Sequence, residues 1–599
     1  MAETVAALVS AHRAGTLKPE DTVARTYDRI RRHGDPAIFI HLRAEADAIA
    51  EARALAGKDA SALPLLGIPV AVKDNIDVGG MPTTSGCEAF KYTASKDATA
   101  IAKLRAAGAI VIGKTNLDQF ATGLVGVRSP YGIPRNTIRP DLIPGGSSSG
   151  SATAVAAGLV PIALGTDTAG SGRVPAGLNN IVGLKPSLGL VSTSGLVPAC
   201  RTLDCISVFA LTTDDAWTAL EVIAGPDATD PYSRNRPVGE MSGCPADLRI
   251  GVPLKGQRIF FGDRASESAY EAAIAKFAAL GAKISEVDIE ALYDTARLLY
   301  EGPWVAERYL AIRSLLASSP DALFPVTKDI IGPGARISAV DTFAALYKLE
   351  ELRRIRDIIF RNIDALLLPT APTAYTVAQV QADPVQLNSR LGTYTNFVNL
   401  LDLCGLALPA SMREDGIPFG ITLLAPGGED AYLASIGRVF HADTHLPMGA
   451  LKLPLPALTP LSPASSSDEI SLAVVGAHLS GMPLNGELKL ENGKFVETAK
   501  TAPDYKLYAL NGGKVPKPGL LRVAPGTGAA IEIEIWRLPA AGFGRFVAAV
   551  PPPMSIGTLK LSDGRMVKGF LVEPEALAGA RDISEFGGWR AFNSAKADA

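Results

Sequence analysis

The stretch Pro144-Gly-Gly-Ser-Ser-Ser-Gly-Ser151 and the later segment Gly165-Thr-Asp-Thr-Ala-Gly-Ser-Gly-Arg-Val-Pro175 decide how this sequence is interpreted. Around them lie short apolar runs bounded by Gly, Pro, Asn or Asp, at 65–75, 108–116 and 160–167. Such runs are typical of buried strands, and the Ala-rich segments between them are typical of helices. The alternation predicts an α/β protein.

Two motifs here match the patterns of other enzymes by spelling alone. Gly108-Ala-Ile-Val-Ile-Gly-Lys-Thr115 fits the phosphate-loop pattern, but its middle residues are strand-like, whereas a phosphate loop needs open backbone amides. Gly146-Ser-Ser-Ser-Gly150 fits the nucleophile elbow of α/β-hydrolases, although a poor strand precedes it. We expect neither a nucleotide site nor an α/β-hydrolase, and an ordinary Gly/Ser loop is the structural alternative for the second motif.

Histidine is absent from the long central part of the chain. The sequence has 6 histidines, at positions 12, 33, 41, 441, 445 and 478, and none between Leu42 and Phe440. Any catalysis in that stretch must work without an imidazole base of its own.

Composition excludes several other classes. The chain has 599 residues with 58 Lys+Arg against 61 Asp+Glu and no clustered positive excess, which argues against nucleic-acid binding. An apolar content of 47% excludes general disorder, and the length suggests two or more domains. Neither a membrane span nor a signal peptide is evident, so a cytoplasmic location is expected. Five scattered cysteines, without a CxxC pair, make a disulfide framework or a cysteine zinc site improbable, and no metal is expected.

The chain divides by composition near residue 455. Helices are expected over 1–60 and again over 264–362. A Pro/Ser-rich linker is expected at 456–467, because proline stiffens and serine solvates such a segment. Beyond it the period becomes that of strands, expected at 469–475, 486–495, 529–539 and 557–573, the last with a hairpin turn at Asp563-Gly564. The predicted domains are 1–455 and a β-rich 468–599.

The combination of Lys73 after an apolar run, the Gly/Ser stretch and the DxxGSxRxP segment resembles the amidase signature family. This resemblance implies an α/β fold with a mixed central sheet flanked by helices. It assigns Ser171 as nucleophile, Ser147 as a bridging serine after a cis peptide bond, and Lys73 as base. It also implies that the backbone N–H groups of three residues face the developing oxyanion, and these residues are Thr168, Ala169 and Gly170. No cofactor is implied.

A lysine can serve as the base in this chemistry. A serine hydroxyl needs a base whose pKa lies near the working pH before it can attack an amide. The pKa of lysine is ordinarily ~10.4, but burial disfavours the ammonium form and lowers it. A lysine at the end of a buried strand can therefore be neutral.

Two further features resemble the allophanate hydrolase branch of the family. Tyr300 and Arg308 match the pair that holds the substrate carboxylate, and a guanidinium suits a planar carboxylate. If the segment is helical they lie about two turns apart, near one face, although Pro303 limits that helix upstream. The second feature is the C-terminal domain, whose stretches LAVVGAHLSGMPLN (472–485) and LYALNGGKVPKPGLLRV (507–523) resemble the α+β C-terminal domain of that branch. That domain is itself similar to γ-glutamylcyclotransferase-like folds. The purely structural alternative for Arg308 is an arginine on the helix surface that pairs with a glutamate.

This branch implies hydrolysis of allophanate to ammonia and N-carboxycarbamate, followed by decarboxylation assisted by the C-terminal domain. His478 matches the histidine of that second step, with a structural histidine as the alternative. Three arginines of the same domain could bind a dianion, and the sequence does not choose among Arg522, Arg537 and Arg545. The resemblance also implies a homodimer and a functional link to urea carboxylase. A signature amidase for another small amide or malonamate-like acid, or an amidotransferase-type subunit of a larger complex, remain alternatives.

Overall fold

The computed structural model describes residues 4–245, 248–459, 461, 469–491, 493–512 and 515–597. The chain forms two compact units, Met1–Ser462 and Pro463–Ala599. Most of the predicted linker 456–467 lies outside the described residues, and the boundaries at 455 and 468 stay a proposal. None of the described helices is long and apolar enough to cross a membrane.

The first unit is built on an 11-stranded mixed sheet with the order β1-β5-β2-β6-β8-β7-β12-β13-β11-β9-β10. Its central strands β5, β2 and β6 run parallel, whereas β8 is antiparallel to β6. The strands are β1 (Phe39–Leu42), β2 (Pro69–Lys73), β5 (Ile110–Thr115), β6 (Ile162–Asp167), β7 (Val182–Lys185), β8 (Cys205–Ala210), β9 (Arg249–Pro253), β10 (Lys283–Val287), β11 (Ala365–Pro369), β12 (Leu403–Met412) and β13 (Pro418–Pro426). A separate two-stranded sheet pairs β3 (Pro82–Thr83) with β4 (Tyr92–Thr93). The predicted mixed central sheet is confirmed.

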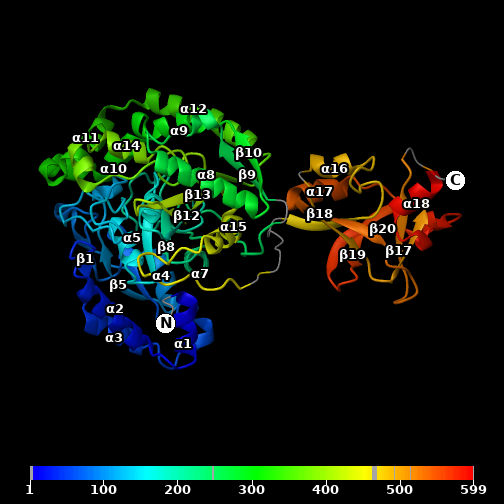
Figure 1. Cartoon of the computed structure of the whole chain (residues 1–599), viewed down its shortest axis with the longest axis horizontal. Helices are drawn as coiled ribbons and strands as arrows, with labels where there is room; N and C mark the ends of the chain where they lie inside the picture. The colour runs from blue at the N-terminus through cyan, green and yellow to red at the C-terminus, as the bar shows by residue number, and fades with distance from the viewer. Residues whose placement is uncertain are drawn as a thin grey trace. The chain divides into compact units, whose positions relative to one another are not determined.

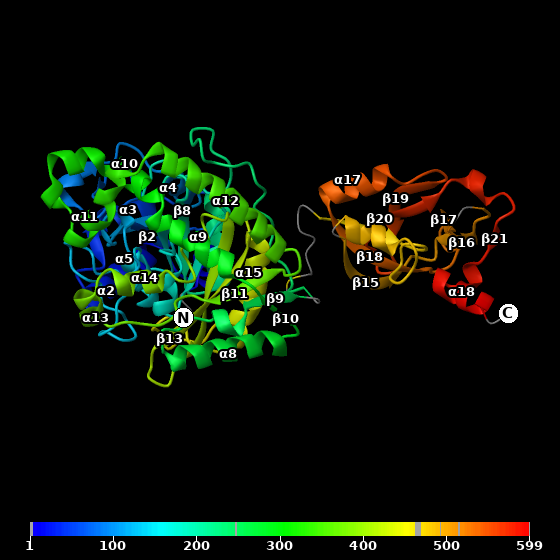
Figure 2. The same cartoon turned by 90° about the horizontal axis from the view of Figure 1, so that it is seen from above.

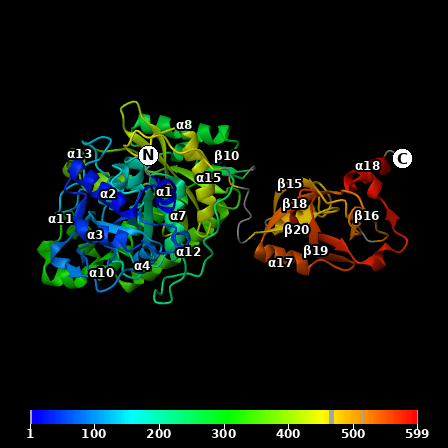
Figure 3. The same ribbon diagram turned by 90° about the horizontal axis from the view of Figure 1, so that it is seen from below.

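Helices cover both faces of this sheet (Figures 1, 2 and 3). Alternate residues of β2 belong to opposite cores, with Val70 and Val72 in one and Ala71 in the other, as the two-residue period of a strand requires. The helices are α1 (Val5–Arg13), α2 (Pro19–His33), α3 (Glu45–Arg53), α4 (Thr99–Ala106), α5 (Ser149–Ala156), α6 (Val174–Leu178), α7 (Thr213–Ile223), α8 (Arg264–Ala279), α9 (Glu290–Glu301), α10 (Trp304–Ser318), α11 (Pro325–Ile331), α12 (Ala339–Ile359), α13 (Val377–Ala382), α14 (Gln386–Leu391) and α15 (Asp430–Asp443).

Two strands interrupt regions that the sequence predicts as helical. β1 lies within 1–60 and β10 within 264–362, and they form the two edges of the large sheet. Edge strands are half-exposed, so their apolar pattern is weak. The helix α2 within 1–60 begins at Pro19, with Glu20 and Asp21 in its first turn, which are residues that favour a helix start.

The second unit is β-rich, as expected. A five-stranded sheet has the order β15-β18-β14-β20-β19, and a three-stranded sheet has the order β17-β16-β21. The strands are β14 (Glu469–Val474), β15 (Lys494–Lys500), β16 (Tyr505–Ala509), β17 (Pro518–Arg522), β18 (Glu532–Pro539), β19 (Met554–Lys560), β20 (Met566–Val572) and β21 (Arg581–Asp582). The helices are α16 (Asn485–Leu490), α17 (Ala540–Ala548) and α18 (Trp589–Ala597).

The strand predicted at 486–495 is wrong in its first half, which forms α16. Alternation would bury both Leu488 and Leu490. The helix instead buries Leu488 completely and leaves Leu490 82% exposed. The predicted hairpin at Asp563-Gly564 joins β19 to β20, with Gly564 in the left-handed region at φ 90°.

Candidate active site

Lys73 ends β2, a strand in which all five residues are buried. The lysine side chain is itself fully buried. Its Nζ donates hydrogen bonds to Ser147 Oγ and to Thr166 Oγ1, both at 2.7 Å. Thr166 belongs to β6, the parallel neighbour of β2, so the sheet fixes the ammonium between two hydroxyl groups.

Burial lowers the pKa of Lys73 to about 7, because the charged form loses its hydration. The carboxylates of Asp118, Asp167 and Asp204 act against this shift, and Arg308 acts with it. A base with such a pKa is neutral in a large fraction of molecules at neutral pH. Lys73 can therefore accept a proton from the hydroxyl of Ser147.

Ser147 follows a cis peptide bond at Gly146-Ser147, as the family resemblance implies. Its carbonyl oxygen accepts the N–H of Asp118 at 3.0 Å. A Cβ atom at position 146 would lie 2.2 Å from Asp118 Oδ2, so only glycine fits there. The Gly/Ser loop is thus held close to the Asp118 turn, immediately before α5.

Ser171 lies in the turn between β6 and α6 and is 2% exposed. The turn is built around the carboxylate of Asp167. This carboxylate accepts the N–H groups of Gly170 and Gly172 at 3.0 Å and a two-point contact from Arg173 at 2.9 and 3.0 Å. Both side chains of the ion pair are fully buried, and its bidentate geometry makes the turn rigid.

This geometry does not support one of the three predicted oxyanion donors. The N–H of Gly170 is already donated to Asp167. Within the described residues, the N–H groups of Thr168 and Ala169 have no protein acceptor, which leaves them available to a ligand. No hydrogen bond joins the hydroxyls of Ser147 and Ser171 in the described part of the chain, so their proton relay stays a prediction.

Tyr300 and Arg308 meet, although they are not on one helix. Tyr300 lies on α9 and Arg308 on α10. The helical conformation is interrupted between them at Gly302 and Pro303. The guanidinium lies over the tyrosine ring, 5.3 Å from its centroid, with Nη2 3.5 Å from the hydroxyl. The alternative of a helix-surface arginine is wrong, because Arg308 is only 2% exposed.

The remaining contacts of Arg308 leave one of its donors without a partner among the described residues. Nη1 donates to Thr122 Oγ1 at 3.1 Å and to the Ala121 carbonyl at 3.4 Å. Nε is buried and has no partner among the described residues. A buried guanidinium with an unsatisfied donor is costly unless an anion completes its hydrogen bonds. This arrangement fits the predicted role in binding a carboxylate.

His478 lies in a separate cavity of about 500 Å³ within the second unit. Its Nε2 is 2.9 Å from Glu487 Oε2, and its ring stacks on Phe570 with centroids 5.1 Å apart. Burial lowers the pKa of His478, and the carboxylate of Glu487 opposes the shift. Among the three candidate arginines only Arg545 lines this cavity, together with Lys517, which the sequence did not suggest.

Comparisons with known proteins match both units. The amidase family profile matches residues 21–433, and the profile of the allophanate hydrolase C-terminal domain matches residues 470–594. The urea amidolyase of Lachancea kluyveri is 44% identical over 579 residues, which are 93% of this chain and 31% of that protein. The chain spans about a third of the length of such curated relatives.

Two further comparisons differ in how much of this chain they match. The structure of Kluyveromyces lactis allophanate hydrolase is similar with a TM-score of 0.81 and 41% identity, covering 99% of both chains. A glutamyl-tRNA(Gln) amidotransferase subunit from Chromohalobacter salexigens is 36% identical, covering 97% of that protein but 74% of this chain. Because the amidase profile matches more than half of the chain and the second profile matches beyond it, the chain belongs to the amidase family, in the group that carries an allophanate hydrolase C-terminal domain.

Proposed function

We propose that the chain hydrolyses allophanate, the urea derivative with a carboxylate on one nitrogen, to ammonia and carbon dioxide. The amidase unit would cleave the terminal amide, and the C-terminal unit would assist the decarboxylation that follows. The observation that carries the proposal is the pair of the buried Arg308 and the half-buried Tyr300, in a unit that also holds the lysine-serine machinery. A small amide substrate with a carboxylate would use both.

In the first reaction Lys73 takes the proton of Ser147, and Ser147 takes that of Ser171. The Ser171 oxygen then attacks the terminal carbonyl carbon of allophanate, while the N–H groups of Thr168 and Ala169 stabilise the oxyanion. Ser147 returns a proton to the departing nitrogen, and ammonia leaves. Water then attacks the acyl-enzyme and releases N-carboxycarbamate, which restores the Ser171 hydroxyl.

In the second reaction the cavity of His478 would receive N-carboxycarbamate. Lys517 and Arg545, the latter ion-paired with Glu491, lie at its wall, and Phe546 and Phe570 make part of it apolar. An apolar wall weakens the hydration of a bound carboxylate, which favours its loss as neutral carbon dioxide. His478, fixed by Glu487, would place a proton on the nitrogen that carbon dioxide leaves. The carbamate formed in this step would take up a further proton and decompose to ammonia and a second carbon dioxide.

A substrate panel tests the proposal. The full chain is assayed for ammonia and carbon dioxide release from allophanate, malonamate, biuret and glutamine. We expect kcat/KM for allophanate to exceed that for biuret, which has no carboxylate, by at least about 100-fold, the size of a lost buried charge pair. It should also exceed the values for malonamate and glutamine. Equal or higher values for malonamate would favour the amidase for malonamate-like acids, and turnover of glutamine would favour the amidotransferase-type subunit.

The similarity to amidotransferase subunits supports that second candidate only for the first unit. Those relatives align with 74% or less of this chain, so the alignments leave at least a quarter of it unmatched. The activity of an amidotransferase subunit would not account for the His478 cavity. Allophanate hydrolysis accounts for both units.

We also propose that urea carboxylase supplies the allophanate. The urea amidolyases similar to this chain are about three times its length, which leaves room in them for a second activity that makes the substrate.

A homodimer is proposed as well. The exposed apolar side chains of α12 offer a surface for a second copy, and they include Val340, Phe343, Tyr347 and Ile358, at 57–78% exposure. Sedimentation of the wild-type chain and of Phe343→Ser would test this, with a monomeric wild type as the contrary result.

A further inference from the structure

Asp204 is a buried carboxylate that touches the oxyanion turn. It is 5% exposed, and its oxygens accept three hydrogen bonds, from the Thr168 hydroxyl, the Ala199 N–H and the Cys200 N–H. Thr168 supplies one of the N–H groups of the oxyanion turn that have no acceptor among the described residues. The carboxylate therefore ties that turn to the loop 199–204.

The loop 199–204 is in turn fastened to α10. Glu307 accepts both the N–H and the hydroxyl of Thr202, each at 2.7 Å. Cys200 Sγ lies 3.5 Å from the carbonyl of Trp304, the first residue of that helix. Arg308 follows Glu307 directly. A continuous set of contacts thus runs from the oxyanion turn, through Asp204, to the helix that carries the carboxylate-binding arginine.

A second bridge runs beside the first. The side-chain amide of Asn399 donates to the carbonyls of Asp167 and Leu203, both at 2.8 Å. The bridge made by Asn399 is neutral, whereas the one made by Asp204 carries charge. Hydrogen bonds to an ionised acceptor are roughly twice as strong as neutral ones, so the charged bridge dominates.

We propose that Asp204 is a positioning residue that sets the distance between the oxyanion donors and Arg308, and that turnover requires its ionised form. This inference rests on the proposed function, in which one small substrate spans both groups. A substrate of that size tolerates little misplacement at either end, because a shift of about 1 Å can cost 10²-fold in rate.

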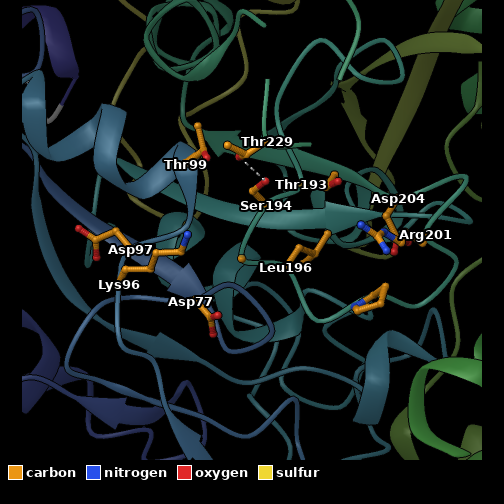
Figure 4. Close-up of a pocket in the computed structure, with 12 residues that line it drawn as sticks. Asp77, Lys96, Asp97, Thr99, Thr193, Ser194, Leu196, Arg201, Asp204 and Thr229 are labelled. Atoms are coloured by element: carbon orange, nitrogen blue, oxygen red, sulfur yellow. Dashed lines mark hydrogen bonds between the residues drawn. The ribbon is translucent and has the colours of Figure 1, made fainter. Parts of the chain in front are cut away.

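The surroundings of Asp204 make its ionisation sensitive to pH. Burial raises its pKa to about 6, while the Thr168 hydroxyl, the Cys200 N–H and the charge of Arg308 oppose the rise and Glu307 adds to it. Lys73 also interacts with Asp204 through its charge. On its outer side Asp204 reaches a polar pocket of about 450 Å³, where it lies beside Arg201 and away from Lys96 and Asp97 (Figure 4).

A neighbouring pocket, which Asp204 and Asp230 both line, supplies a matched control. Asp230 is 6% exposed and also accepts a backbone N–H and hydroxyl hydrogen bonds, from Thr193 and Ser192. Its hydrogen bonds do not reach the oxyanion turn. Asp230→Asn therefore removes a comparable buried charge without breaking the contact with Thr168.

The test compares Asp204→Asn, Asp230→Asn and wild type for ammonia release from allophanate across pH. We expect Asp204→Asn to lower kcat/KM at pH 8 by about 30- to 100-fold and Asp230→Asn by less than threefold.

The pH profile is the second readout. In wild type the plot of log(kcat/KM) against pH should have a slope of one between about pH 6 and 7, because Lys73 binds a proton there. The slope should approach two below about pH 6, where Asp204 binds a proton as well. Asp204→Asn should keep a slope of one throughout. A slope of two in that variant, or equal rates in both variants, would overturn the proposal.

Thr168→Val guards against loss of folding in Asp204→Asn. It removes one hydrogen bond that lowers the pKa of Asp204, so the second bend of the profile should move to higher pH; an unmoved bend would contradict the inference. If wild type releases no ammonia from allophanate, the proposed function fails separately. The rate of Ser171 sulfonylation by phenylmethanesulfonyl fluoride then replaces turnover, with at least tenfold slower labelling expected for Asp204→Asn than for Asp230→Asn.

Discussion

The two candidate sites differ most in how far they are closed to water. In the amidase unit Lys73 and Ser147 are fully buried and Ser171 is 2% exposed. In the C-terminal unit the side chain of His478 is 14% exposed and that of its partner Glu487 is 54% exposed. Burial in the first site turns an ordinary lysine into a base with a pKa of about 7. Amide cleavage needs this, whereas loss of carbon dioxide from a labile dicarboxylate needs only a local change of charge and hydration.

Removal of the nucleophile should have the largest effect. Ser171→Ala leaves no group to attack the carbonyl, so we expect ammonia release to fall by at least about 10⁴-fold. Intact-mass analysis after phenylmethanesulfonyl fluoride treatment should show no adduct in this variant. Thermal unfolding should match wild type, because the hydroxyl makes no hydrogen bond to Ser147 among the described residues. Near-normal turnover would refute the assignment.

Removal of the base should come next and should alter the pH dependence of stability. Lys73→Met is expected to lower kcat/KM by about 10³-fold at pH 8. Because the folded pKa of Lys73, about 7, lies below its ordinary value of 10.5, the unfolded chain binds more protons between these values. Wild-type stability should therefore gain from Lys73 as pH rises from 7 to 10.5. The difference in free energy of unfolding between Lys73→Met and wild type, followed by urea titration, should change over that window and stay constant below it.

Removal of the carboxylate grip should have a smaller and substrate-dependent effect. Arg308→Met should lower kcat/KM for allophanate by about 100-fold, since a buried charge pair is lost. For biuret, in which an amide replaces the carboxylate, we expect a change of less than about threefold. Arg313→Met, an exposed position on the same helix, is the control and should leave both substrates unchanged. Equal losses on both substrates would show that Arg308 acts through packing alone.

Sequence analysis identified the residues that stand in short stretches resembling a family motif. Ser147, Ser171 and Lys73 each stand in a stretch that the chemistry constrains on its own. Thr166 and Asp204 were missed because their roles arise from contacts between segments distant in the chain, which no local pattern records. The misassigned first half of 486–495 has a related cause, because the alternation of Gly486 to Leu490 fits a strand and only tertiary burial of Leu488 selects a helix.

The smallest effect is expected in the open site. His478→Gln should leave ammonia release from the amidase unit unchanged and slow carbon dioxide release about tenfold, below the 10²–10⁴ typical of acid–base catalysis, because N-carboxycarbamate also decomposes unaided. Arg545→Gln should have a comparable effect, since Arg545 lines the same cavity. Arg522→Gln, whose guanidinium instead bonds Tyr505 and Thr558, is the control and should change neither rate. Time courses of ¹³C-labelled allophanate by NMR separate the two steps. Equal accumulation of N-carboxycarbamate in wild type and His478→Gln would show that the C-terminal cavity has no part in decarboxylation. The two sites would then differ in function as well as in exposure, because only the amidase unit would be catalytic.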